Sequence, residues 1–366
     1  MTCCQGVRKR TRFTFSRIAM LCVCVCILSG SALPSQAEQS GPYVALTVDG
    51  DRPRYAPQSY VSGGFKVRGS DTMHPLMTRL ASEFQRRQPK VTIEIRTGGS
   101  AKAIAEFLEV PPVGRIVLKE ERSSQVVLVA TSRELLDTEV KQFSSQHGYE
   151  PTAIPVAVDA VALYVHKDNP LPGLTLDQVD AMFSTTRHRG YQSPLTEWGQ
   201  LGLESGWEKA SIRLYGRDRK SGTRGFFQEH VLGGGEFSPL VHEQPGAASV
   251  ILALSRDQSG IGYSGLGLLA SSVRAVPLAE HEGMPFVTPS SGTVADQSYP
   301  LRRVLYLYVD QPPASALSPA VQEFLTFIAS REGQETVIRA GFYPLPFPQS
   351  EKISARLSAP PALFNR

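Results

Sequence analysis

The chain has 366 residues, of which 41% are hydrophobic and 20% charged, and its formal net charge is +4. The first 37 residues hold five basic residues and no acidic one. The remainder therefore carries 33 basic and 34 acidic side chains, a balance that argues against a nucleic-acid-binding surface. All five cysteines also lie in this first segment, which leaves the rest of the chain without a disulfide, a thiolate metal site or a cysteine nucleophile.

The N-terminal segment has the pattern of a signal peptide for export. Basic residues within 8–17 precede an apolar run at 18–28 that is short for a membrane span, and Ser35-Gln36-Ala37 fits a small-x-small cleavage site. Gly30-Ser31-Ala32 is a second candidate cleavage site, and an uncleaved membrane anchor is the alternative to a signal peptide. We expect a Sec signal peptide at 1–37, cleaved after Ala37, and therefore a periplasmic or secreted protein.

The first half of the mature chain repeats the succession of strand, loop and helix three times. The predicted elements are an N-terminal extension at 38–64 with one short strand at 43–48, a strand at 65–69, a helix opened by Ser70-Asp71-Thr72, a strand at 91–95, a helix at 101–108, an irregular charged connection at 109–124, a strand at 125–130 and a helix opened by Thr131-Ser132-Arg133. This alternation predicts an α/β fold whose ligand-binding loops lie at the carboxyl ends of the strands.

The second half begins with a long apolar strand and ends with two helices. The predicted elements are a strand at 155–166, a helix at 175–183, a loop-rich stretch at 187–206, a strand at 212–215, helices at 225–232 and 246–254, a strand at 302–309, two helices within 319–340 and a tail at 347–366. The strands at 155–166 and 302–309 are candidates for crossing between two domains. Residues 260–265 spell G-x-G-x-x-G but lack the flanks of a dinucleotide site, so we interpret them as a glycine-rich strand.

The loop at 216–224 has the composition of an anion site. It precedes a predicted helix, whose N-terminus presents unpaired N–H groups and a partial positive charge. Ser221 and Thr223 add hydroxyl donors, Gly222 lets the backbone come close, and Arg217 adds a guanidinium fork. We predict that this loop binds a tetrahedral oxyanion. The other basic residues of the loop are expected at the rim or in solvent: Arg219, Lys220 and Arg224.

Three other loops place a hydroxyl residue at a predicted helix start, namely Thr72, Ser100 and Ser132. Taken singly, a Ser or Thr at such a position is by default a helix cap. Together with Ser221 they form a set of four similar loops. We therefore predict that the four loops share one site.

Several segments occur in the order found in the PstS-like periplasmic phosphate-binding proteins of ABC importers. The chain resembles this family in GSDTMHPLMTRLASEFQRRQP, TGGSAKAIAEFL, VLVATSREL, GRDRKSGTRGFFQEHVL, GIGYSGLG and FLTFIASREGQETVIRAGFYPLP, which cover most of 65–346. The resemblance implies a type II periplasmic-binding fold, in which two crossing strands join two α/β lobes that close over a ligand. It places lobe 1 at 65–155 with 301–346 and lobe 2 at 156–300.

The resemblance also implies which residues contact the ligand: Ser70, Asp71, Thr72, Ser100, Arg217, Ser221, Gly222 and Thr223. Ser132 and Arg133 join this set as residues of the third loop. The best-known phosphate binders have an aspartate where this chain has Arg133, and that aspartate accepts a proton that sulfate does not carry. Asp71 is a candidate replacement for this acceptor, or else an ion-pair partner of Arg133. The sequence leaves the choice among phosphate, sulfate, arsenate and molybdate open.

The resulting prediction is a non-enzymatic receptor that binds phosphate or a related oxyanion and delivers it to the membrane subunits of an ABC importer. We expect a monomer with no cofactor, no metal and no nucleic-acid partner. A phosphate sensor or scavenging protein would have the same sequence pattern, and a structural module that has lost its ligand is a further alternative. A serine hydrolase or phosphatase is the enzymatic alternative, but the mature chain lacks Ser-x-x-Lys, Gly-x-Ser-x-Gly and His-Glu-x-x-His motifs.

Overall fold

The computed structural model describes residues 46–57, 59–109, 128–267, 270–313 and 315–346. The predicted signal peptide at 1–37 and the predicted tail at 347–366 lie outside these ranges, as do residues 110–127 of the expected irregular connection and of the strand after it. Within the described ranges, no helix combines the length and the apolar character needed to cross a membrane.

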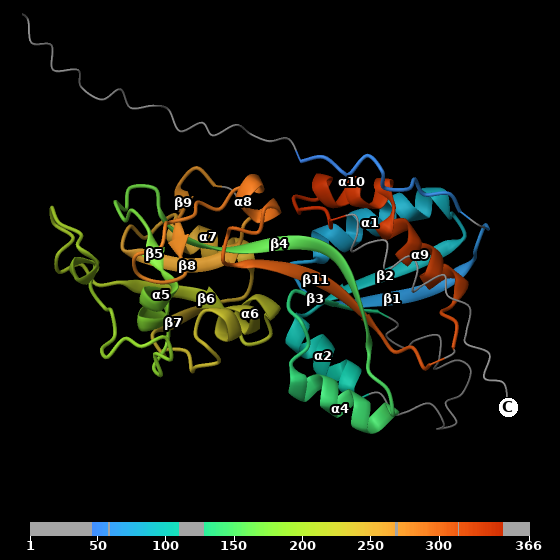
Figure 1. Ribbon diagram of the computed structural model, residues 1–366, viewed down its shortest axis with the longest axis horizontal. Helices are drawn as coiled ribbons and strands as arrows, with labels where there is room; N and C mark the ends of the chain where they lie inside the picture. The colour runs from blue at the N-terminus through green and yellow to red at the C-terminus, as the bar shows by residue number, and fades with distance from the viewer. Residues whose placement is uncertain (1–45, 58, 110–127, 268–269, 314, 347–366) are drawn as a thin grey trace, which may run out of the picture. The chain divides into compact units, whose positions relative to one another are not determined.

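Two groups of elements lie on either side of two long strands (Figure 1). We call the first group lobe 1; its elements are β1 (Gly63–Gly69), α1 (His74–Arg87), β2 (Val91–Thr97), α2 (Ser100–Leu108), β3 (Leu128–Thr131), α4 (Asp137–His147), α9 (Pro319–Ala329) and α10 (Arg331–Arg339). The second group is lobe 2; its elements are β5 (Leu174–Thr175), α5 (Leu176–Phe183), a 3₁₀ turn (Trp198–Leu201), β6 (Arg213–Arg217), α6 (Gly222–His230), β7 (Val241–Gln244), α7 (Ala247–Leu254), β8 (Gly260–Gly265), β9 (Val273–Ala275), β10 (Leu278–Ala279) and α8 (Ser291–Ala295). The strands between them are β4 (Thr152–His166) and β11 (Arg302–Val309).

The sheet is continuous through these two strands. Its order is β2-β1-β3-β11-β4-β8-β6-β7, with β9 also paired to β4, while β5 and β10 form a separate pair. β11 pairs with β3 of lobe 1 and along β4, and the distal part of β4 then pairs with β8 of lobe 2. The predicted crossing strands therefore connect the lobes as the apolar runs at 155–166 and 302–309 indicated.

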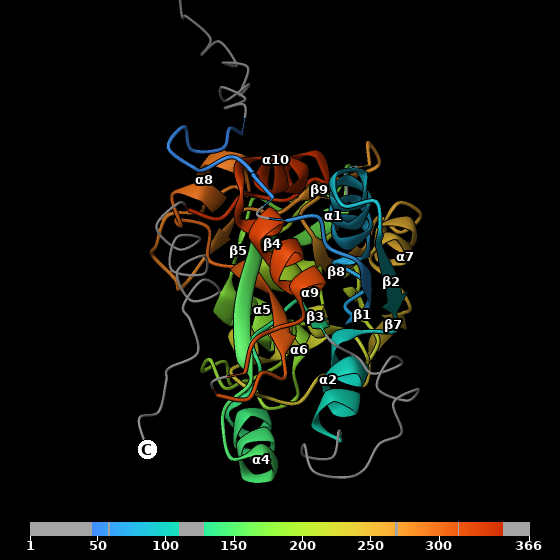
Figure 2. The same cartoon turned by 90° about the vertical axis from the view of Figure 1, so that its right-hand side faces the viewer.

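Both faces of the lobe 1 strands are covered by helices (Figure 2). Helices α1, α9 and α10 contact one another and the strands β1 and β2, and their apolar side chains belong to the main core. Helices α2 and α4 lie on the other face, where Phe107 and Phe143 pack against Val129 and Tyr308. In α1 the buried residues recur at helical spacing, which is why this stretch forms a helix with one face on the sheet: Leu76, Met77, Leu80, Ala81 and Phe84.

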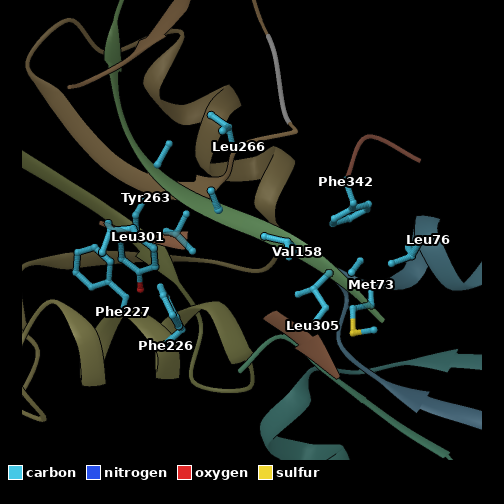
Figure 3. Close-up of a cluster of buried hydrophobic side chains, with 14 of the residues drawn as sticks. Met73, Leu76, Val158, Phe226, Phe227, Tyr263, Leu266, Leu301, Leu305 and Phe342 are labelled. Carbon is cyan, nitrogen blue, oxygen red and sulfur yellow. The ribbon is translucent and has the colours of Figure 1, made fainter. Parts of the chain in front are cut away.

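The main core continues from lobe 1 into lobe 2 along β4 and β11 (Figure 3). Met73 and Phe342 on the lobe 1 side, and Phe227 and Tyr263 on the lobe 2 side, are less than 9% exposed. Phe227 and Tyr263 stack with ring centroids 3.9 Å apart. Because apolar side chains cover the crossing strands on both sides, a charged residue inside these strands requires a partner.

Two predicted helix starts are wrong. Residues 70–73 form a turn in which Met73 N donates to Ser70 O, and α1 begins only at His74 without a side-chain cap. Likewise, Thr131–Arg133 do not open a helix. α4 begins at Asp137, where the Glu139 carboxylate reaches back to accept from Leu136 N at 2.8 Å. This acidic residue in the first helical turn, rather than the upstream Ser or Thr, supplies the N-terminal contact.

The strand expected at 43–48 is also wrong for its described part, because residues 46–48 belong to no helix or strand. This N-terminal segment nevertheless packs on the fold. Arg52 is 2% exposed and donates to the carbonyls of Ala329 at 2.8 Å and Leu345 at 2.5 Å. By contrast, the interpretation of the glycine-rich run at 260–265 as a strand is confirmed by β8.

Candidate functional site

Loops at the carboxyl ends of four strands meet between the lobes. The loops after β1, β2 and β3 come from lobe 1, and the loop between β6 and α6 comes from lobe 2. The closest approach is at Gly222, where an added Cβ would lie 2.3 Å from Ser100 Oγ and 2.5 Å from Ser132 Oγ. Gly99 approaches the same loop, and the N–H of Ala101 donates to the Lys220 carbonyl at 3.2 Å. The structure therefore confirms the prediction that these four loops lie together.

The hydroxyl groups of these loops lie within reach of one another, both within lobe 1 and across the lobes. Thr72 Oγ1 and Thr223 Oγ1 are 3.2 Å apart, and Ser100 Oγ and Ser132 Oγ are 3.4 Å apart. The N–H of Ser132 also donates to Ser100 Oγ at 3.2 Å. A hydroxyl rotates to donate where an acceptor is offered, so this set provides convergent donors for the oxygens of an anion.

Ser221 caps helix α6, and its Oγ accepts from Arg224 N at 3.4 Å. The first residue of the helix, Gly222, lies against Ser100 and Ser132, so this helix N-terminus is next to the loops of lobe 1. The helix has nine residues, begins at Gly222 and has no acidic residue in its first turn, so its positive end is not neutralised by its own side chains. The prediction of a helix N-terminus at this loop is therefore confirmed, although α6 begins three residues before the predicted helix.

Arg217, the last residue of β6, supplies the main positive charge. Its side chain is 1% exposed, and its nearest carboxylate oxygen is Asp71 Oδ2, 3.9 Å from Nη2. Within the part of the chain that the structure describes, Nε and Nη1 have no hydrogen-bond partner. Burial lowers the pKa of the guanidinium, and the charge of Asp71 opposes this shift. A buried cation so weakly compensated is a position where an anion is favoured.

The backbone around Arg217 is fixed by an aromatic side chain. The N–H of Arg217 donates to Tyr263 Oη at 3.3 Å, and a Cβ at Gly216 would lie 3.0 Å from the Tyr263 ring. Tyr263 is fully buried and stacks on Phe227 of α6 (Figure 3). The strand that carries Arg217 and the helix that carries Gly222 and Thr223 are thus held by one pair of rings.

Ser70 and Asp71 support the first loop. Ser70 is 4% exposed, and its N–H donates to the Ala130 carbonyl at 2.8 Å, which ties the loop after β1 to the loop after β3. Asp71 Oδ1 accepts from Gly98 N at 3.2 Å, while its other oxygen faces Arg217. Of the two roles considered for Asp71, the ion pair with Arg133 does not form.

Arg133 is paired with Glu139 instead. Its Nη1 and Nη2 donate to the two carboxylate oxygens at 2.8 and 2.7 Å, and Nη1 also donates to the Glu134 carbonyl. Its Nε lies 2.9 Å from the position of a Cβ on Gly225, so the side chain passes beneath α6 of lobe 2. The structure therefore places Arg133 at the edge of the set, with its charge compensated within lobe 1.

The other basic residues of the loop differ in their surroundings. Arg219 is 87% exposed and Lys220 is exposed, as expected. Arg224 was expected at the rim or in solvent, and of these two alternatives the solvated one is wrong, because its side chain is 13% exposed. Its guanidinium lies 3.9 Å over the Phe237 ring and donates to the Arg217 carbonyl at 3.1 Å, a packing arrangement that stabilises the loop.

Two buried charged residues beside the site were not singled out from the sequence: Asp159 on β4 and Arg303 on β11. Arg303 Nη1 donates to Thr223 Oγ1 at 3.1 Å, and its Nη2 donates to Asp159 Oδ2 at 2.6 Å. A signal was present for Asp159, which is a carboxylate inside a long apolar strand, but not for Arg303, which follows Arg302 at the start of β11. Among the described residues, no group of three or more His, Cys, Asp or Glu side chains is placed to hold a metal ion.

Two α/β lobes joined by crossing strands, with a set of convergent hydrogen-bond donors where the loops of both lobes meet, define a type II periplasmic binding protein. Two solved structures share this fold. One is a proposed phosphate ABC transporter substrate-binding protein from Clostridium perfringens with bound phosphate, with a TM-score of 0.61 and 25% identity over 78% of this chain and 100% of that chain. The other is an ABC-type phosphate transport receptor from Vibrio cholerae, with a TM-score of 0.58 and 19% identity over 77% of this chain and 100% of that chain.

Sequence comparison gives the family. Residues 52–332 match the model of the PBP superfamily domain. The chain is 43% identical to the phosphate-binding protein PstS of Pseudomonas aeruginosa over 305 residues, which are 83% of this chain and 90% of that protein. The chain belongs to the PBP superfamily and, within it, to the PstS-like phosphate-binding proteins.

Proposed function

We propose that this protein binds inorganic phosphate between its two lobes and delivers it to the membrane subunits of an ABC importer, without a chemical step. The observation that carries the proposal is Arg217, a buried guanidinium beside Asp71 of lobe 1 whose Nε and Nη1 have no hydrogen-bond partner among the described residues. Charge-assisted hydrogen bonds at such a dry position are stronger than those between neutral groups. The relationship to the phosphate-binding PstS protein supports phosphate as the anion.

We assign ligand-binding roles to the loop residues that meet between the lobes. The set consists of Ser70, Asp71, Thr72, Ser100, Ser132, Arg217, Ser221, Gly222 and Thr223, with Arg133 as a peripheral member. Asp71 has a particular place in this set, because its carboxylate oxygen beside Arg217 is an acceptor for the proton of a phosphate. Sulfate has no such proton and would meet an unpaired acceptor. We therefore propose that Asp71 favours phosphate over sulfate.

Closure over the ligand is proposed to occur about the crossing strands β4 and β11, between a lobe at 65–155 with 301–346 and a lobe at 156–300. The segment at 38–64 is then an N-terminal extension of the mature protein. We further propose export through the signal peptide, with cleavage after Ala37, and a monomeric mature protein. Mass spectrometry of the exported protein tests the cleavage site, and light scattering tests the oligomeric state.

Isothermal titration of the mature protein with phosphate, sulfate, arsenate and molybdate tests the binding function. We expect phosphate to bind and Arg217→Met to weaken it by more than about 2 kcal/mol, roughly 30-fold, because a buried charge pair with the anion is lost. The exposed Arg219→Met is the matched control and should change the affinity less than about twofold. No heat with any of the four anions would refute the proposal, and equal affinities for phosphate and sulfate would refute the role of Asp71.

A further inference from the structure

The crossing strands carry a buried ion pair at the point where the sheet passes from one lobe to the other. Arg303 on β11 and Asp159 on β4 are direct cross-strand partners. Nε and Nη2 of Arg303 donate to the same carboxylate oxygen, Asp159 Oδ2, at 3.0 and 2.6 Å. The two side chains are 2% and 3% exposed. Because an isolated charge at this depth is strongly unfavourable, each group depends on the other.

The third nitrogen of the guanidinium, Nη1, does not bind Asp159. Nη1 of Arg303 extends into lobe 2 and donates to Thr223 Oγ1 at 3.1 Å. Thr223 is 1% exposed, lies in the first turn of α6, and has Thr72 Oγ1 from lobe 1 at 3.2 Å. A residue of the crossing strands therefore contacts the first turn of the helix that carries the anion loop.

This contact determines whether the Thr223 hydroxyl is presented to the site as a hydrogen-bond donor or as an acceptor. A hydroxyl has one proton and two lone pairs, and here one lone pair is occupied by the N–H of a cation. The same positive charge directs the hydroxyl proton away from Arg303, toward the side where Thr72 lies. Thr223 is consequently presented to the site as a donor. A donor is what the oxygens of a phosphate require, whereas a hydroxyl that presents a lone pair would repel them.

We propose that Arg303 is a positioning residue of the anion site, which fixes the Thr223 hydroxyl as a donor and is itself held and neutralised by Asp159. The inference rests on the proposed function, since it assigns the site an anion. Neutralisation by Asp159 matters because Arg217 is also buried nearby; burial lowers the pKa of Arg217, and the positive charge of Arg303 adds a smaller contribution in the same direction. With Asp159 in place, Arg303 orients a donor without adding a second uncompensated charge.

The test is a set of variants measured by titration with inorganic phosphate and by thermal unfolding. Removing Arg303 alone would leave Asp159 charged, so the informative variant is the neutral double replacement Arg303→Met with Asp159→Asn. We expect it to bind phosphate about tenfold more weakly than the wild type, the loss expected for one hydrogen bond to a charged group. Thr223→Val should have an effect of the same size, because the hydroxyl itself is removed.

Combining the replacements distinguishes positioning from a structural role. If Arg303 acts through Thr223, the double replacement in a Thr223→Val background should weaken binding by less than about twofold further. The inference is overturned if the affinity losses of the double replacement and of Thr223→Val multiply when they are combined. It is also overturned if Arg303→Met with Asp159→Asn binds phosphate like the wild type. Arg303→Lys is the second variant, since an ammonium can pair with Asp159 and preserve folding but cannot also reach Thr223 as the guanidinium does. It should keep the wild-type melting temperature and bind about tenfold more weakly; wild-type affinity would overturn the inference.

The same titrations separate this inference from the proposed function. If the wild type binds phosphate and Arg217→Met weakens binding as expected while the Arg303 variants bind like the wild type, only the positioning role fails. If the wild type binds no phosphate, the proposed function and the positioning role fail together.

Discussion

The close approach of Gly222 to two serines of lobe 1 predicts that a larger residue at this position weakens phosphate binding by an amount that can be estimated. In Gly222→Ala, the new methyl would lie 2.3 Å from Ser100 Oγ and 2.5 Å from Ser132 Oγ, while ordinary van der Waals contact begins at 3.4 Å. Rotation of the serine hydroxyls would not relieve the overlap, because the Ser100 Cβ would still lie 2.7 Å from the new methyl, so the loops would have to separate by roughly 0.7 Å. Because the three residues belong to different lobes, the separation would draw the donors of lobe 2 away from those of lobe 1.

Overpacking of this kind typically destabilises by about 1–3 kcal/mol, which corresponds to roughly a 5- to 150-fold loss in affinity when it falls on the closed form alone. The assay is titration with phosphate, combined with thermal unfolding in its presence and absence. The wild type should gain about 2.7 kcal/mol of stability at a phosphate concentration of 100 times Kd. Gly222→Ala should gain less at the same concentration, while its melting temperature without phosphate should stay close to that of the wild type.

Gly292→Ala in α8 is the matched control, because its Cβ would have no neighbour closer than 3.7 Å. It should bind phosphate with wild-type affinity. If Gly222→Ala also binds within about twofold of the wild type, the reasoning is refuted, since the loops of the two lobes would then not approach each other in the bound state in the way the structure has them.

Two further replacements test the surroundings of the site. Arg133→Ala should weaken phosphate binding less than tenfold, well below the effect of Arg217→Met, because Glu139 already compensates the charge of Arg133; a loss as large as that of Arg217→Met would contradict this and can be measured in the same titrations. Arg52→Ala should lower the free energy of unfolding by about 2–4 kcal/mol in urea denaturation, because two buried carbonyls lose their donor, whereas the exposed Arg54→Ala should change it by less than about 0.5 kcal/mol. Equal effects of the two replacements would show that the segment around residue 52 does not contribute to the fold.

The fold was largely predictable because its elements have strong local patterns. The apolar run at 155–166 and the alternating run at 302–309 predicted the crossing strands, and the helical spacing after residue 73 predicted α1. Helix starts were less predictable. A hydroxyl residue before an apolar pattern does not reveal whether the helix begins there, as at Ser221, or several residues later, as after Ser132.

The sequence by itself indicated the chemistry of the site, because Arg217, Ser221 and Thr223 lie together in one loop between a predicted strand and a predicted helix. It also determined that the other donors come from loops of one type. Only the tertiary structure decided which side chains compensate the buried charges in and beside the site. Arg133 pairs with Glu139, which is only six residues away in the sequence. Arg303 instead donates to Asp159, 144 residues away in the sequence, and to Thr223, 80 residues away. The energies of buried charges depend on such contacts, which arise when strands pair, and no local pattern records them.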